Sequence, residues 1–111
     1  MNEDLKKYLF DIKTSIEYIH EYLGPKRNFT QYQSDRKLRR AVERELEIIG
    51  EATNNILKSA PDIAITDARK IVGLRNRIIH AYDAVDDPMI WDIVVNHLPL
   101  LEREVGELLK D

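Results

Sequence analysis

The sequence of 111 residues contains no cysteine and no long uncharged stretch. The absence of cysteine excludes a disulfide scaffold, a cysteine-ligated zinc site and a thiol nucleophile. The longest run without a formal charge covers nine residues, 93–101, whereas a membrane-spanning helix needs about 20 apolar residues. The N-terminal segment 1–7 is charged and lacks the apolar core of a secretory signal. These absences predict a cytoplasmic protein with no membrane partner.

What is present fits one globular domain over residues 1–111. Hydrophobic residues make up 43% of the chain and charged residues 33%, which is enough apolar material for one modest core. The formal net charge of −3 excludes a uniformly basic coat for nucleic acid. The three histidines share no ligand-like spacing and no loop holds paired carboxylates, so the sequence indicates neither a metal site nor a cofactor.

Apolar residues recur at helical spacing in four segments, which are separated by breaks at residues 24–25, 60–61 and 86–88. In the first segment, 2–23, they follow one another at intervals of four and three residues. Gly24 suits the left-handed position that ends a helix. The second and third helices are expected over about 34–59 and 66–80, with Ser34 or Asp35 and Thr66 or Asp67 as their N-caps.

The fourth segment opens with Asp87 as the expected N-cap and Pro88 at the first helical position, where proline is well tolerated. Pro99 lies inside the apolar repeat of this segment and should kink or interrupt the helix near Leu98. No segment shows the alternation of a strand. The sequence therefore predicts an all-α, antiparallel bundle of four or five helices.

Two glycines, Gly50 and Gly73, fall in the interiors of predicted helices. Each costs roughly 1 kcal/mol relative to alanine in an exposed helix interior. Either glycine can mark the close approach of another helix, from the same chain or from a partner, or can simply be tolerated. The sequence does not choose between these two interpretations.

Positive charge is concentrated in two blocks, residues 26–44 with a net charge of +5 and residues 69–82 with +4. If the second and third helices are neighbours, these blocks form one basic surface that can bind a phosphate backbone. The alternative is a pair of solvated helix faces, on which Arg40 and Arg44 pair with Glu43 and Glu47. The charge pattern alone favours this alternative.

The residues best suited to chemistry lie in segment 74–82. His80 can exchange protons near neutral pH, and the guanidinium fork of Arg75 suits a phosphate. Asn76 precedes His80 by four residues and shares its helix face, and Tyr82 adds a hydroxyl group. Arg75 and His80 lie about 140° apart around a helix, so one helix face cannot hold both. A site that uses both residues can form if the helix ends near His80, or if a twofold axis brings two copies of the helix together. The twofold arrangement is preferred because homodimers are the commonest oligomers.

This segment resembles the signature of HepT-like HEPN proteins. The resemblance consists of Arg75-Asn76, the four residues between Arg75 and His80, and Tyr82 two residues after the histidine. These proteins are the toxin halves of HEPN/MNT toxin–antitoxin pairs in bacteria and archaea. The resemblance extends over the first apolar stripe, the stretch 46–52 and the segment from Trp91 onward. It implies a helical bundle that forms homodimers and acts as a metal-independent endoribonuclease, with the motifs of two chains in one composite cleft.

The resemblance also implies a role for each motif residue. His80 would be the general base or acid for attack of a ribose 2′-hydroxyl on its own phosphate. Arg75 would stabilise the charge on the phosphate, and Asn76 would orient it. The expected partner is a minimal nucleotidyltransferase that silences the toxin by transferring AMP onto Tyr82. Arg39, Arg40 and Arg77 are candidates for contacts with RNA or with a partner.

Plainer interpretations stay open beside these. His80 can be a helix-capping residue and Arg75 a solvated one, and the whole chain can be a non-catalytic helical partner of a minimal nucleotidyltransferase or a dimerisation bundle. Phe29 and Tyr32 can stack on RNA bases, although packing within the loop after Pro25 is favoured.

Overall fold

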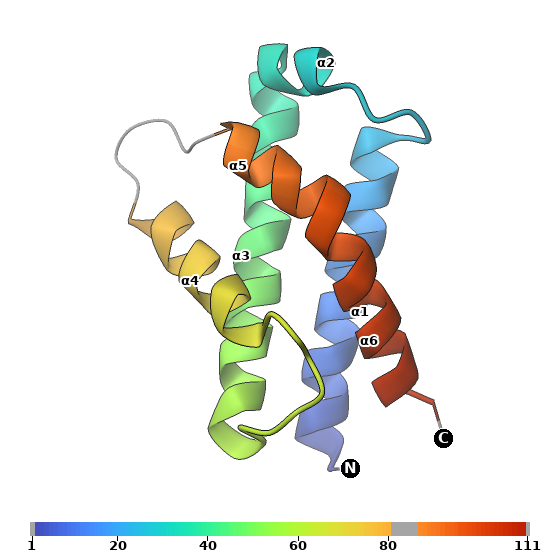
Figure 1. Cartoon of the computed structure of the whole chain (residues 1–111), viewed down its shortest axis with the longest axis vertical. Coiled ribbons are helices and arrows are strands. Elements are labelled where there is room, and N and C mark those ends of the chain that lie inside the picture. The colour runs from blue at the N-terminus through green and yellow to red at the C-terminus, as the bar shows by residue number, and fades with distance from the viewer. Residues whose placement is uncertain (1, 81–86, 111) are drawn as a thin grey trace.

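The computed structural model describes residues 2–80 and 87–110, and this part of the chain contains helices and no strand (Figure 1). The described residues span 42 × 30 × 19 Å. The helices are α1 (Glu3–Leu23), α2 (Phe29–Ser34), α3 (Arg36–Ser59), α4 (Ala68–Ile79), α5 (Asp87–Asp92), a π-helical turn η1 (Ile93–His97) and α6 (Leu98–Leu108). The prediction of an all-α fold is confirmed.

The helices α1, α3 and α4 run side by side, and α3 is antiparallel to both of its neighbours (Figure 1). The α5–η1–α6 segment crosses this layer and packs on α1 through α6. Buried aliphatic side chains from all of these elements form one core, which is the main source of stability in a bundle of this kind. None of the described helices is long and apolar enough to cross a membrane.

The ends of α1 and α3 follow from the residues that flank them. The side chain of Asn2 accepts a hydrogen bond from the Leu5 N–H at 2.7 Å, and the side chain of Asp35 accepts one from the Leu38 N–H at 3.0 Å. Both are N-cap interactions that satisfy a free donor of the first helical turn. At the other end of α1, Gly24 has a φ of 72° and donates its N–H to the carbonyl of His20. The predicted limits of these helices are confirmed.

Helix α2 lies where a loop was expected. The side chain of Asn28 caps it by accepting from the Gln31 N–H at 3.0 Å. The ring centroids of Phe29 and Tyr32 lie 5.8 and 5.2 Å from that of Trp91 on α5. Tyr32 is only 1% exposed, and this burial raises the pKa of its phenol. Packing within the chain, rather than stacking on RNA bases, therefore accounts for both residues.

The expected interruption at Pro99 takes the form of a π-helical turn. Pro99 is in the first turn of α6, and residues 93–97, which directly precede α6, form η1. Proline has no N–H to give to the preceding turn, and a π-helical turn is one way in which a helix accommodates such a break. Asp87 is the first residue of α5 rather than its N-cap, one residue earlier than predicted.

The two helical glycines differ in their surroundings. A Cβ atom at Gly50 would lie 2.2 Å from Cβ of Arg75 and 3.2 Å from the carbonyl oxygen of Ile71, whereas a Cβ atom at Gly73 would meet nothing within 4 Å. Gly50 therefore allows α3 and α4 to approach closely within one chain. No contact within the described part of the chain explains Gly73.

We expect Gly50→Ala to lower the free energy of unfolding by about 1–3 kcal/mol, because the added methyl group forces α3 and α4 apart. The matched variant Gly73→Ala should raise it by up to about 1 kcal/mol through helix propensity alone. Urea denaturation followed by circular dichroism measures both changes. Equal changes in the free energy of unfolding for the two variants would contradict the close approach of α3 and α4 at Gly50.

Candidate active site

Helix α4 carries the candidate catalytic residues. Ala68, Leu74 and Ile78 bury one side of this helix in the core, which turns the side chains between them toward α3 or toward solvent. His80 is the residue directly after the last turn, and its N–H donates to the carbonyl of Asn76 at 3.1 Å. The helix thus ends at the histidine, as expected.

Arg75 is held against α3. Its guanidinium donates from Nη2 to Oε2 of Glu51 at 2.5 Å and from Nη1 to Oδ1 of Asn76 at 2.9 Å. Its aliphatic stem lies over Gly50, and its side chain is 26% exposed. Two hydrogen bonds and a packed aliphatic stem restrict the guanidinium more than solvent contacts do, so Arg75 is positioned before any substrate binds.

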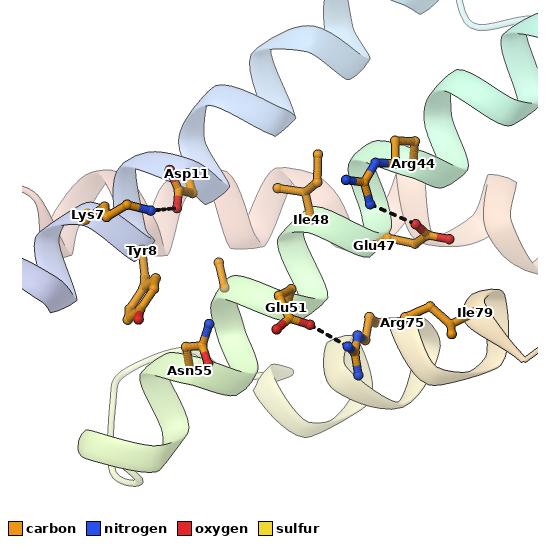
Figure 2. Close-up of a pocket in the computed structure, with 11 residues that line it drawn as sticks. Lys7, Tyr8, Asp11, Arg44, Glu47, Ile48, Glu51, Asn55, Arg75 and Ile79 are labelled. Atoms are coloured by element: carbon orange, nitrogen blue, oxygen red, sulfur yellow. Dashed lines mark hydrogen bonds and ion pairs between the residues drawn. The ribbon is translucent and has the colours of Figure 1, made fainter.

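Beside Arg75 lies a cavity of about 360 Å³ between α1, α3 and α4 (Figure 2). Its charged side chains are neutralised in pairs, because Lys7 lies 2.8 Å from Asp11, Arg44 lies 3.1 Å from Glu47, and Glu51 holds Arg75. Its apolar rim includes Tyr8, Ile48 and Ile79, of which Ile79 is 46% exposed. We call it the Arg75 cavity.

His80 does not line the Arg75 cavity. Its side chain is exposed and makes no hydrogen bond or ion pair with a described residue. Asn76, also exposed, lies one turn before His80 and accepts the hydrogen bond from Arg75. One chain therefore joins Arg75 to Asn76 and leaves His80 on a different side of α4, as the helical geometry of the sequence predicts.

The other candidate contacts are distributed around α5 and the start of α3. Arg77 donates to the sulfur of Met89 at 3.0 Å, and Arg39 lies 3.9 Å from the carboxylate of Asp87 and donates to the carbonyl of Gln33. The side chain of Arg40 is 69% exposed, although it lies 3.8 Å from Glu43. The pairing of Arg40 and Arg44 with Glu43 and Glu47, the plainer interpretation of this basic block, is present. Tyr82 lies outside the described residues.

Sequence reasoning did not single out Glu51 as a partner of Arg75. The two residues are 24 positions apart, and no pattern along the chain connects them. Two signals were available: the glycine next to Glu51 in the middle of a predicted helix, and the place of Glu51 in the stretch 46–52 that carries part of the family resemblance. The described residues include no group of three or more His, Cys, Asp or Glu side chains placed to hold a metal ion.

An all-helical domain with an ordered arginine, an adjacent amide and an accessible histidine on one short helix has the groups for cleaving a phosphodiester. A family model described as "Ribonuclease HepT-like" matches residues 12–108. The chain therefore belongs to the HepT-like ribonuclease family, which confirms the resemblance and the assignment as a ribonuclease.

Two relatives match over nearly their whole lengths. A protein of Thermococcus cleftensis named "Probable ribonuclease HepT" is 36% identical over 99% of this chain and 100% of its own length. A protein of Methanocaldococcus jannaschii that carries an RNase name, MJ0127, is 31% identical over 98% of this chain and 90% of its own. No solved structure matches the chain significantly.

Glu51→Gln should lower kcat for RNA cleavage about tenfold, because a loosely held arginine loses its alignment with the phosphate. KM should stay level or fall, since one negative charge leaves the site. Steady-state kinetics on a short RNA measures both parameters. The matched control is Glu47→Gln, which makes the same charge change in the same cavity but removes a partner of Arg44 instead. Equal losses of kcat in both variants would contradict the positioning role of Glu51.

Proposed function

We propose that this protein is the toxin component of a HEPN/MNT toxin–antitoxin system and acts as a metal-independent endoribonuclease whose site combines Arg75 and His80 from two copies of the chain. The observation that carries the proposal is the division of these groups within one chain. Arg75 faces Glu51 and the Arg75 cavity, whereas His80 lies outside that cavity. A second copy of the chain can supply a histidine beside Arg75 and an arginine beside His80.

The proposed reaction begins when a neutral imidazole nitrogen of His80 accepts the proton of a ribose 2′-hydroxyl. The 2′-oxygen attacks the adjacent phosphorus, and the bond from phosphorus to the 5′-oxygen breaks. The imidazolium that this step forms on His80 then gives the proton to the leaving 5′-oxygen. The products are a 2′,3′-cyclic phosphate and a 5′-hydroxyl. Such acid–base help contributes roughly 10²–10⁴-fold to the rate.

Arg75 and Asn76 act on the phosphate in this scheme. The guanidinium, fixed by Glu51 and Asn76, donates to the phosphoryl oxygens as their negative charge grows. Donors that are in place before the reaction need no reorganisation when that charge develops. Asn76, which already holds Nη1 of Arg75, orients the phosphate relative to His80.

The surface next to Arg75 has the character of a homodimer contact. Ile79 is exposed and shares the rim of the Arg75 cavity with Ile48 and Tyr8. Apolar side chains gathered on a surface beside polar groups are typical of a protein interface. A twofold contact at this rim would bring the α4 helices of two copies toward one another, as the composite site requires.

Wild-type protein, expressed without a nucleotidyltransferase, should cleave a structured RNA in excess EDTA, and Arg75→Ala and His80→Ala should each abolish cleavage. Mixed dimers that carry Arg75→Ala in one chain and His80→Ala in the other should recover about half of the wild-type activity, because one of two symmetric sites is then complete. Two affinity tags isolate the mixed dimers, and gel analysis of RNA fragments measures cleavage.

Two results would contradict this proposal. If mixed dimers stay as inactive as their parents while wild type cleaves, the site lies within one chain. If folded wild-type dimers do not cleave at all, the chain is better described as a non-catalytic partner subunit of a nucleotidyltransferase.

We also propose that a minimal nucleotidyltransferase antitoxin silences the enzyme by modifying Tyr82. The tyrosine oxygen would attack the α-phosphorus of ATP, with pyrophosphate as the leaving group and AMP esterified to the ring. Tyr82 follows His80 by two residues, so the added phosphate would compete with RNA for the cations of this segment.

Coexpression with the proposed minimal nucleotidyltransferase antitoxin should add AMP to the wild-type chain and abolish its cleavage of RNA. Tyr82→Phe should gain no mass and should keep cleaving. Intact-mass spectrometry and the EDTA assay measure the two effects. Tyr18→Phe is the matched control, because Tyr18 is 45% exposed but lies on α1. Modification that persists in Tyr82→Phe would overturn the assignment of the acceptor.

A further inference from the structure

We propose that a groove between α3 and α4, separate from the Arg75 cavity, holds the RNA strand on one side of the scissile phosphate. This inference rests on the proposed ribonuclease function and names a substrate-binding surface for it. The groove has a volume of about 430 Å³ and is lined by Asn54 and Lys58 from α3, by Arg69, Gly73 and Asn76 from α4, and by two apolar side chains. We call it the α3–α4 groove.

The first observation is that no contact within the described part of the chain explains why position 73 is a glycine. Glycine is a poor helix former, and at Gly50 its use is explained by the approach of Arg75. At Gly73, by contrast, an added Cβ would touch nothing within 4 Å, and the residue is exposed. A bare stretch of helix backbone that lines a groove can admit a close approach by a group from outside the chain.

The second observation is the alignment of the groove with the candidate catalytic residues. Arg69, Gly73, Asn76 and His80 are spaced so that they form one stripe along α4, and all four are exposed. With the axial rise per residue of an α-helix, the stripe is about 16 Å long from Arg69 to His80. A few nucleotides can span this length. Asn76 belongs both to the groove and to the hydrogen bond with Arg75. A strand in the groove would therefore reach the proposed cleavage site directly.

The third observation is that the groove has unpaired positive charge. Lys58 and Arg69 lie on its two walls and make no ion pair with a described residue, and none of the described acidic residues lines the groove. The Arg75 cavity is the opposite, because each of its cations has a carboxylate partner. A polyanion gains most where cations are not already neutralised.

These charges also favour RNA over a second copy of the chain as the occupant. A twofold contact along this stripe would place the cations of one copy near those of the other, which is unfavourable. A phosphate backbone would instead neutralise Lys58 and Arg69 together. The amides of Asn54 and Asn76 can both donate and accept hydrogen bonds, which suits base edges and 2′-hydroxyl groups of single-stranded RNA.

The test measures RNA binding in a His80→Ala background, so that the strand stays intact, with a short fluorescein-labelled oligouridine as the probe and fluorescence anisotropy as the readout. The double variant Lys58→Ala/Arg69→Ala should raise Kd about tenfold and reduce the slope of log Kd against log salt by about 1.4, the value for two lost contacts to a single strand. Gly73→Leu should raise Kd by a similar factor by filling the groove, and Gly73→Ala by much less.

The matched control for charge is Lys13→Ala/Arg103→Ala, which removes two exposed cations outside the groove and outside both basic blocks. It should leave Kd nearly unchanged. Equal weakening by both double variants, or normal RNA binding by Gly73→Leu, would overturn the proposal. So would a Gly73→Leu protein that becomes monomeric in light scattering, because a second copy would then cover the stripe.

The groove and the catalytic proposal can fail separately. If protein with His80 intact does not cleave RNA but the groove variants still lose binding, the groove stands as an RNA-binding surface and the catalytic scheme fails. If wild type cleaves and the groove variants bind and cleave normally, the groove proposal alone is wrong.

Discussion

The close crossing of α3 and α4 at Gly50 determines where every candidate functional group on α4 lies. Because Gly50 has no side chain, the stem of Arg75 rests directly on α3 and its guanidinium comes within reach of Glu51. The same crossing fixes the rotation of α4 about its own axis. The stripe that contains Asn76 and His80 consequently faces outward. A larger residue at position 50 would change the position of the candidate catalytic arginine and the exposed face of α4 together.

This arrangement produces two neighbouring surfaces with different electrostatic properties. The Arg75 cavity has its charges matched in pairs and an apolar rim at Ile79, and such a surface suits another protein chain. The α3–α4 groove has cations that no described carboxylate neutralises, and such a surface suits a phosphate backbone. The net charge of −3 is thus compatible with the proposed binding of RNA, because the unpaired positive charge is local rather than general.

Much of this could be predicted from the sequence, and the part that could not has a common physical cause. Apolar periodicity and capping residues act over a few positions, so they located α1, α3 and α4 and the break before Pro99. Helix α2 has only six residues, too few to show a period, and it is stabilised by Trp91, about sixty positions away. The pairing of Glu51 with Arg75 and the difference between Gly50 and Gly73 are likewise set by contacts between distant segments.

The angular separation of Arg75 and His80 follows from helix geometry alone, and it has a consequence for regulation. If each chain carries an ordered arginine but must obtain its histidine from a partner, a single chain is inactive although its phosphate-binding group is already in position. Activity then depends on dimerisation. The conformational entropy of the Arg75 side chain is lost during folding rather than during RNA binding. A modification at Tyr82, next to the histidine in sequence, would act on the part of the site that completes it. One small negatively charged group would therefore suffice to silence the enzyme without unfolding either chain.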